Sequence, residues 1–175
     1  MATVELRDIV TEDDVEAVMG LRRGPGKEGY LGSMISHFED AIADAAACPR
    51  MWSVHDGDEL VGFVMISDDI PAETLAANAD YVGPYFLWRL LIDQGSQGRG
   101  YGSATTDAVA GYVRTRPRGD ALFTSCRDGD GSPMSFYLRY GFVKTGEIAD
   151  GEEILRLHLA GRPDVAAAAR NGGPG

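Results

Sequence analysis

The sequence has few of the residues that build disulfide frameworks or metal sites. Its 175 residues include two cysteines, Cys48 and Cys126, and three histidines without metal-ligand spacing. Two widely spaced thiols form neither a disulfide framework nor a zinc site, and no HExxH motif occurs. We therefore expect no metal and a reducing environment.

Long hydrophobic runs are also missing. No segment approaches the roughly 18 consecutive apolar residues of a membrane span. The N-terminal stretch MATVELRDIVTEDD has neither the basic start nor the apolar core of a secretory signal. We expect no membrane partner, and a cytoplasmic protein is the default.

Basic residues are outnumbered by acidic ones, 16 against 27, for a net charge of −11. Nucleic-acid binding needs clustered Lys and Arg at the phosphates, and anionic membranes attract polybasic segments. Neither partner is expected. The acidic excess would attract cationic substrates, although it serves equally well for solubility alone.

Apolar residues make up 44% of the chain and charged residues 25%, which is typical of a globular protein. We expect a single domain over residues 1–160 and a flexible C-terminal tail over residues 161–175. Hydrophobic periodicity predicts an α/β fold of the mixed kind, with helices on both faces of one sheet. The expected strands are 4–9, 51–55, 59–67, 85–92, 121–126, 142–148 and 153–159. The expected helices are 12–22, 33–47, 72–77, 102–114 and 133–140.

The segment from Leu90 to Ser103 carries the strongest chemical signal, because a buried strand runs into a Gly-rich turn that opens a helix. Such a turn directs backbone N–H groups and the helix dipole at an anion, which predicts a phosphate or pyrophosphate site. A Walker A loop is excluded because Gly-Lys-Ser/Thr is absent. The spacing of Gly98, Gly100 and Gly102 does not match the GxGxxG of a dinucleotide-binding turn.

Two motifs then point to a family. The run Gln97-Gly98-Arg99-Gly100-Tyr101-Gly102 resembles the Q/R-x-x-G-x-G/A signature of the GNAT superfamily of N-acetyltransferases. About 35 residues later, Phe136-Tyr137-Leu138-Arg139-Tyr140-Gly141-Phe142 is similar to that family's F-Y-x-x-x-G-F element. The segment YFLWRLLID followed by QGRGYG resembles bacterial spermine/spermidine (diamine) acetyltransferases in particular.

The resemblance implies a mostly antiparallel sheet of about seven strands with a splayed parallel central pair. It implies acetyl-CoA as the cofactor and direct transfer, in a ternary complex, to a primary amine of a small cationic, polyamine-like acceptor. It also allows a homodimer. Alternatives are an antibiotic amino group or a protein N-terminus as the acceptor, or a non-catalytic acyl-CoA sensor.

The resemblance assigns coenzyme A binding to two segments and two further residues. The residues are Leu90, Leu91 and Ile92 on a strand expected to carry a bulge, the turn Gln97, Gly98, Arg99, Gly100, Tyr101, Gly102 and Ser103, and then Asp130 and Arg139. Asp130 stands where the family often has a pantetheine-contacting Asn, and Asp accepts but does not donate. Arg139 would reach a ribose phosphate or lie on the surface. Tyr137 matches the general acid that protonates the leaving thiolate.

The acceptor side is less defined. Phe86 stands where some family members carry a catalytic Glu, so a water relay to Asp80, Glu28 or Tyr85 is one expectation. Trp88 either forms an aromatic wall of the amine site or packs in the core. Arg89 is expected to form a structural ion pair. Glu28 and Tyr30 lie in the region that shapes the acceptor site, and further acids would flank the cleft, namely Glu39, Asp40, Asp68 and Asp69.

Overall fold

Seven strands form one sheet in the computed structural model, which describes residues 1–25 and 34–161. The spatial order is β1-β2-β3-β4-β5-β7-β6, and β4 and β5 are parallel while the other neighbours are antiparallel. The strands are β1 (Glu5–Asp8), β2 (Pro49–Asp56), β3 (Glu59–Asp68), β4 (Tyr85–Ile92), β5 (Ala121–Cys126), β6 (Val143–Ala149) and β7 (Glu152–His158). This is the mixed, mostly antiparallel sheet that the sequence predicts.

The helices begin and end close to their sequence signals. They are α1 (Glu12–Met19), α2 (Met34–Ala43), α3 (Ala72–Ala77), α4 (Tyr101–Arg114) and α5 (Met134–Tyr140), with short 3-10 turns η1 (Ala45–Ala47) and η2 (Gln94–Ser96). Thr11 caps α1 through a capping box with Asp14. The expected helix 33–47 is wrong at its C-terminal end. It breaks after Ala43, and Cys48 turns left-handed at φ 50° before Pro49, a residue that disfavours helix at the preceding position.

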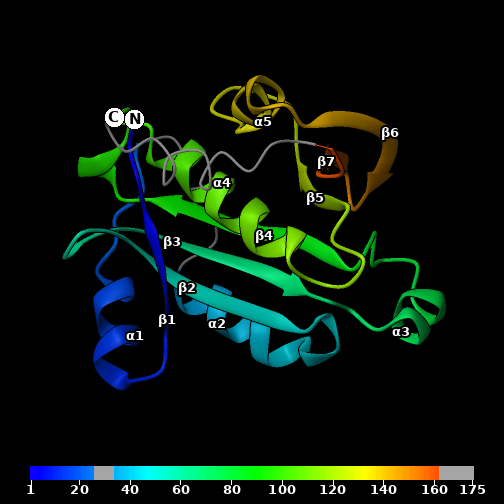
Figure 1. Cartoon of the computed structure of the whole chain (residues 1–175), viewed down its shortest axis with the longest axis horizontal. Helices are drawn as coiled ribbons and strands as arrows, with labels where there is room; N and C mark the ends of the chain where they lie inside the picture. The colour runs from blue at the N-terminus through cyan, green and yellow to red at the C-terminus, as the bar shows by residue number, and fades with distance from the viewer. Residues whose placement is uncertain (26–33, 162–175) are drawn as a thin grey trace, which may run out of the picture.

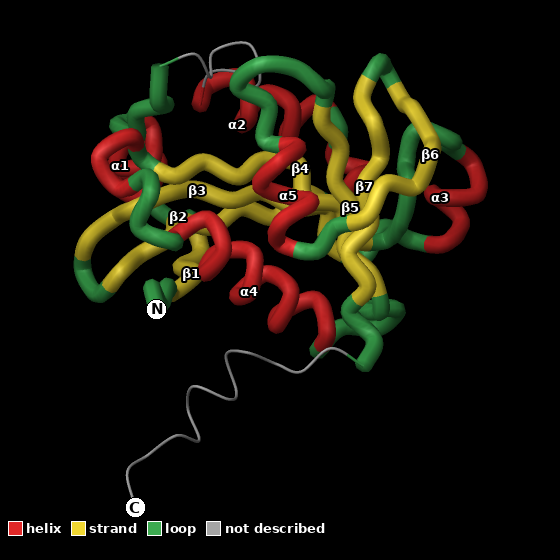
Figure 2. The backbone as a smooth tube through the Cα atoms, turned by 90° about the horizontal axis from the view of Figure 1, so that it is seen from above, coloured by secondary structure: helices red, strands yellow, loops and turns green. Residues whose placement is uncertain are grey.

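The helices cover both faces of the sheet (Figures 1 and 2). Helices α4 and α5 lie on one face, α1 and α2 on the other. The α4–α5 side holds the larger core cluster, which includes Leu87, Leu122 and Tyr137. The α1–α2 side holds a smaller cluster around Phe63 and Leu91. The two sides of β4 therefore face two different environments.

A β-bulge interrupts β4 at Trp88. Arg89 and Leu87 pair with successive residues of β3, so Trp88 is the extra residue. The expectation of a bulge at Leu90–Ile92 is wrong, because those three residues pair regularly with β3. The bulge shifts the alternation of side chains, so Leu87 before it and Leu90 after it both face the α4 side.

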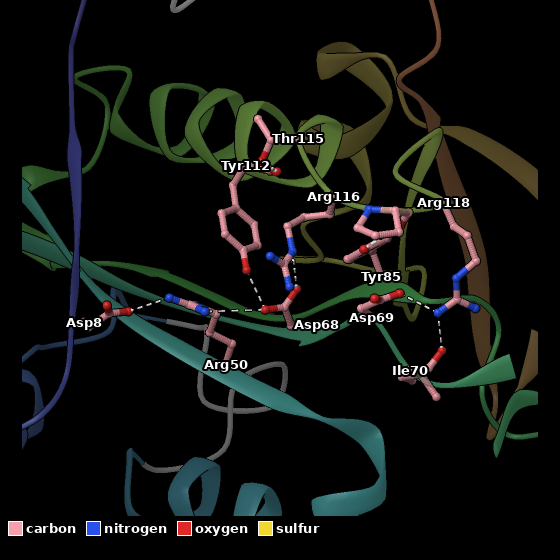
Figure 3. Close-up of polar contacts among 11 residues, drawn as sticks. Asp8, Arg50, Asp68, Asp69, Ile70, Tyr85, Tyr112, Thr115, Arg116 and Arg118 are labelled. Atoms are coloured by element: carbon pink, nitrogen blue, oxygen red, sulfur yellow. Dashed lines mark hydrogen bonds and ion pairs between the residues drawn. The ribbon is translucent and has the colours of Figure 1, made fainter. Parts of the chain in front are cut away.

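A polar cluster fixes the C-terminal end of α4 to the sheet (Figure 3). The Tyr112 hydroxyl donates to Asp68 Oδ2 at 2.6 Å, and Arg50 and Arg116 lie 3.6 and 3.8 Å from the same carboxylate. Asp69 beside it pairs with Arg118. Both acids are thus engaged by arginines at the C-terminal end of α4, whereas the Gly-rich turn lies at its N-terminal end.

No helix among the described residues is both long and apolar enough to cross a membrane. The expected tail lies outside the described residues from 162 onward.

Candidate active site

A cleft opens where β4 and β5 separate. The two strands pair only at Phe86 with Phe123 and at Leu87 with Thr124, and the Thr124 hydroxyl donates to the Leu87 carbonyl at 2.9 Å. Beyond this point residues of both strands line a cleft of about 530 Å³. The splay leaves this edge of β4 without a partner strand, and an unpaired edge offers backbone N–H and C=O groups to a ligand.

The Gly-rich turn forms one end of the cleft. Gly98 and Gly100 have φ of 76° and 88°, and Gly100 is the N-cap of α4. Positive φ strains any residue with a Cβ, so both turn positions favour glycine. The first turn of α4 also leaves N–H groups without intrahelical acceptors, and Gly102 and Ser103 line the cleft there.

Side chains hold this turn in place. Gln97 donates through Nε2 to the carbonyl of Ile92 at 3.0 Å, which joins the turn to the end of β4. Asp93 accepts from the backbone N–H groups of Arg22 and Gly95, each at 2.8 Å. Burial raises the pKa of Asp93, but these hydrogen bonds outweigh it and hold the pKa below its usual value. The turn is therefore preorganised.

Tyr137 lies in the wall of the same cleft on α5. Its side chain is 7% exposed, and its ring meets Phe136 and Phe142 edge to face at 5.3 and 5.2 Å. Burial raises the pKa of Tyr137 to about 12, although a hydrogen bond with Thr124 opposes the shift. The phenol thus stays protonated at neutral pH and can donate a proton.

Most of the predicted site residues meet in this cleft. Its lining includes Leu90, Leu91, Ile92, Gln97, Gly98, Gly100, Tyr101, Gly102, Ser103, Tyr137 and Arg139 from the expected cofactor and catalytic set, and Phe86 and Trp88 from the expected acceptor set. The Tyr101 hydroxyl turns to Asp56 and donates to it at 2.5 Å.

Four predicted residues lie elsewhere. Tyr85 is 0% exposed in the α4-side core and donates to the Pro117 carbonyl at 2.7 Å, so its expected role at the acceptor is wrong. Asp80 does not line the cleft but a second hollow of about 40 Å³, which shares Phe86 and Trp88 with it. Arg99 stacks over Tyr101 instead of lining the cleft.

Asp130 is the fourth. It follows β5 in a loop with Gly129 and Gly131 at positive φ, and it does not line the cleft. The Asn-like contact to pantetheine therefore has no support from its position. Glu28 and Tyr30 lie outside the described residues.

Arg89 forms the structural ion pair that the sequence predicts. Its Nη2 lies 3.1 Å from Asp40, and its Nε donates to Nδ1 of His37 at 3.1 Å. Burial first, and then the Arg89 charge, lower the pKa of His37 to about 4. His37 is therefore a neutral acceptor stacked near Phe63.

Sequence reasoning missed the acidic residue of the cleft. Glu152, the first residue of β7, is the only carboxylate among the described lining residues, which also include Arg89, Arg127 and Arg139. The expectation of an acid-lined cleft is thus wrong for the described part of the chain. No local motif marks Glu152. The Asp150-Gly151 turn indicates only that a strand starts at about this position. The register of β7 against β5 then brings Glu152 to the cleft.

The residues present fit coenzyme A. Diphosphate recognition needs free N–H donors at a helix N-terminus and glycines that allow close approach, and Gly98 has no atom within 4 Å of an added Cβ. Arg139 adds a cation to the same cleft. The cleft then continues along the unpaired edge of β4 to Tyr137, which gives an extended arm a path to the phenol.

Comparisons with known proteins agree with this geometry. No curated protein matches the sequence. Among solved structures, the RimL ribosomal L7/L12 alpha-N-protein acetyltransferase in complex with coenzyme A has a TM-score of 0.62 at 17% identity, over 90% of this chain and 95% of that chain. A Bacillus subtilis acetyltransferase in complex with coenzyme A has a TM-score of 0.57 at 14% identity, over 89% and 97%.

The spermidine/spermine N-acetyltransferase SpeG of Vibrio cholerae, in complex with manganese ions, has a TM-score of 0.57 at 15% identity, over 97% of both chains. At such identities these likenesses show a shared fold. The model of the acetyltransferase (GNAT) family matches residues 15–142. The protein therefore belongs to the GNAT family and is an acetyl-CoA-dependent N-acetyltransferase.

Proposed function

We propose that this protein transfers acetyl directly to a primary amine in a ternary complex, with Tyr137 as the general acid. The observation that carries the proposal is the buried phenol of Tyr137 in the same cleft as the glycine turn and the separated strands. A nucleophilic enzyme residue is not needed, because an amine attacks a thioester by itself once it is deprotonated.

Each part of the cleft has a role in this proposal. The turn Gly98–Ser103 binds the diphosphate through backbone N–H groups. The free edge of β4 at Leu90–Ile92 pairs with the extended pantetheine arm, in the manner of an added strand. When bound, acetyl-CoA supplies the activated thioester. A backbone N–H of β4 polarises the carbonyl oxygen, and Tyr137 donates its proton to the departing sulfur.

The charges of the cleft and the structural comparisons bear on the class of the acceptor. The resemblance and the fold of SpeG favour a polyamine-like acceptor, and so does the net charge of −11. The described cleft contains one carboxylate and three arginines, which does not favour a polycation over an acceptor with one ammonium group. The fold of RimL adds protein N-termini as a second candidate class. We propose that the acceptor is a primary amine that places one ammonium group in the cleft, and that it is either a polyamine-like molecule or a protein N-terminus.

The test is release of free coenzyme A thiol from acetyl-CoA, measured with a thiol reagent. The panel contains spermidine, spermine, putrescine, an aminoglycoside, amino acids and short peptides with free N-termini. Turnover with one class supports the proposal and names the acceptor. Tight coenzyme A binding without turnover on any amine would contradict it and would indicate an acyl-CoA sensor.

Tyr137→Phe supplies the mechanistic arm. It removes one oxygen and keeps the ring contacts with Phe136 and Phe142. We expect kcat to fall roughly ten-fold or more with little change in the KM for acetyl-CoA. An unchanged kcat would remove Tyr137 from the mechanism.

A further inference from the structure

The general base, for which the sequence offers no residue on β4, has a candidate on β7. Glu152 is the only acid among the described residues that line the cleft. Resting on the proposed function, we propose that Glu152 binds the ammonium group of the acceptor and takes its proton before attack.

A hydrogen bond orients the Glu152 carboxylate. The Ser125 hydroxyl donates to Oε2 at 2.5 Å, which holds one oxygen against β5. The other oxygen, Oε1, lies 3.9 Å from Nε of Arg127, at the outer limit of an ion pair. The Arg127 side chain is 66% exposed, so water weakens that contact. Oε1 thus has capacity to accept a hydrogen bond from an ammonium group.

Strand alternation places the base and the acid on opposite sides of the gap. Cys126 belongs to the core that contains Tyr137, on the α4–α5 side. Side chains of successive residues on a strand point to opposite faces, so Ser125 points to the α1–α2 face, and Glu152 bonds it there. An amine bound at Glu152 therefore approaches from the face opposite to Tyr137, which suits attack on one side and protonation of sulfur on the other.

Two other acids, Asp40 and Glu153, already form ion pairs. Asp40 pairs with Arg89 at 3.1 Å, and Glu153 pairs with Lys144 at 2.7 Å. His37 is 1% exposed and accepts from Arg89. Glu152, in contrast, lines the cleft, and its Oε1 has only the long contact with Arg127. The titratable and charged groups that interact electrostatically with Glu152 are Arg127 and Cys126 at the end of β5 and Tyr137 of α5.

The proton balance uses both residues. Glu152 takes one proton from R–NH₃⁺, and the freed lone pair of nitrogen forms the C–N bond to the acyl carbon. The C–S bond breaks, its electron pair goes to sulfur, and sulfur takes the proton of Tyr137. The nitrogen then gives its second proton to the Tyr137 oxygen, which restores the phenol. Glu152 releases to solvent the proton that it took first. The products are the amide, the free thiol and one proton.

The experiment compares Glu152→Gln with Glu153→Gln, using the best acceptor from the panel. Both changes remove one negative charge from the start of β7, but only Glu152 lines the cleft. The amide oxygen of Gln can still accept from Ser125, and thermal unfolding checks that each variant folds. For Glu152→Gln we expect kcat/KM for the amine to fall about 10²- to 10⁴-fold, while calorimetry shows unchanged coenzyme A affinity.

The pH profile separates catalysis from structure. The pH profile of kcat/KM should change its shape in Glu152→Gln, while Glu153→Gln keeps the profile of the wild type. Ser125→Ala should lower kcat less than Glu152→Gln, since it only loosens the orientation of the carboxylate.

Equal kcat/KM and equal pH profiles for Glu152→Gln and wild type would overturn the inference and leave the proposed function standing. Absence of turnover in the wild type itself would instead refute the proposed function, and this inference with it.

Discussion

Gly98 offers a test of the cofactor turn that separates binding from stability. Gly98 has φ of 76° and Gly57, in the β2–β3 hairpin, has φ of 59°, and neither has an atom within 4 Å of an added Cβ. Alanine at either position should lower the free energy of unfolding only through the strain of the left-handed backbone, by about 1–2 kcal/mol. For a chain of this length the melting temperature should fall by about 2–8 °C in both variants.

Of these two glycines, only Gly98 lines the cleft. A methyl group there would push the diphosphate away from the backbone donors. Losing one hydrogen bond to a charged group costs about 1.5–3 kcal/mol, or roughly a 10- to 150-fold loss of affinity. We therefore expect Gly98→Ala to bind coenzyme A at least ten-fold more weakly by calorimetry, while Gly57→Ala binds it like the wild type. Equal affinity in the two variants would refute the assignment of the turn.

Three further outcomes follow from buried groups. Because burial raises the pKa of Tyr137 to about 12, kcat should stay flat through pH 10, and a fall near 10 would show an ordinary phenol. Burial lowers the pKa of His37 to about 4, so as the pH drops the unfolded chain is protonated at this residue before the folded protein is. The free energy of unfolding should therefore fall by about 2–3 kcal/mol between about pH 6.5 and pH 4. Urea unfolding should show a weaker pH dependence for His37→Gln, and parallel curves for both proteins would contradict this. Tyr85→Phe removes the hydrogen bond to the carbonyl of Pro117, an exposed residue, and should cost about 0.5–1.5 kcal/mol of stability in the same assay, without changing kcat; a large loss of kcat at unchanged stability would return Tyr85 to the site.

Fold prediction succeeded where local signals were strong. The Asp56-Gly57-Asp58 turn, the apolar run of β4 and the Gly-rich start of α4 all lie within a residue or two of their expected places. It failed at the end of α2, where a continuous apolar pattern hides the break before Pro49. The family resemblance placed the bulge wrongly, because a bulge depends on the pairing of two strands and cannot be located from the sequence of one strand.

The sequence by itself predicts the proposed cofactor side of the cleft. The turn from Gln97 to Ser103 and the helix around Tyr137 are contiguous segments, so their chemistry can be read from order and spacing. The proposed acceptor side depends on the tertiary structure. Glu152, Ser125 and Trp88 come from three strands, and only the register of those strands and the bulge at Trp88 bring them to one cleft. Register is set by the burial of whole faces of the sheet, and no short segment of the chain encodes it.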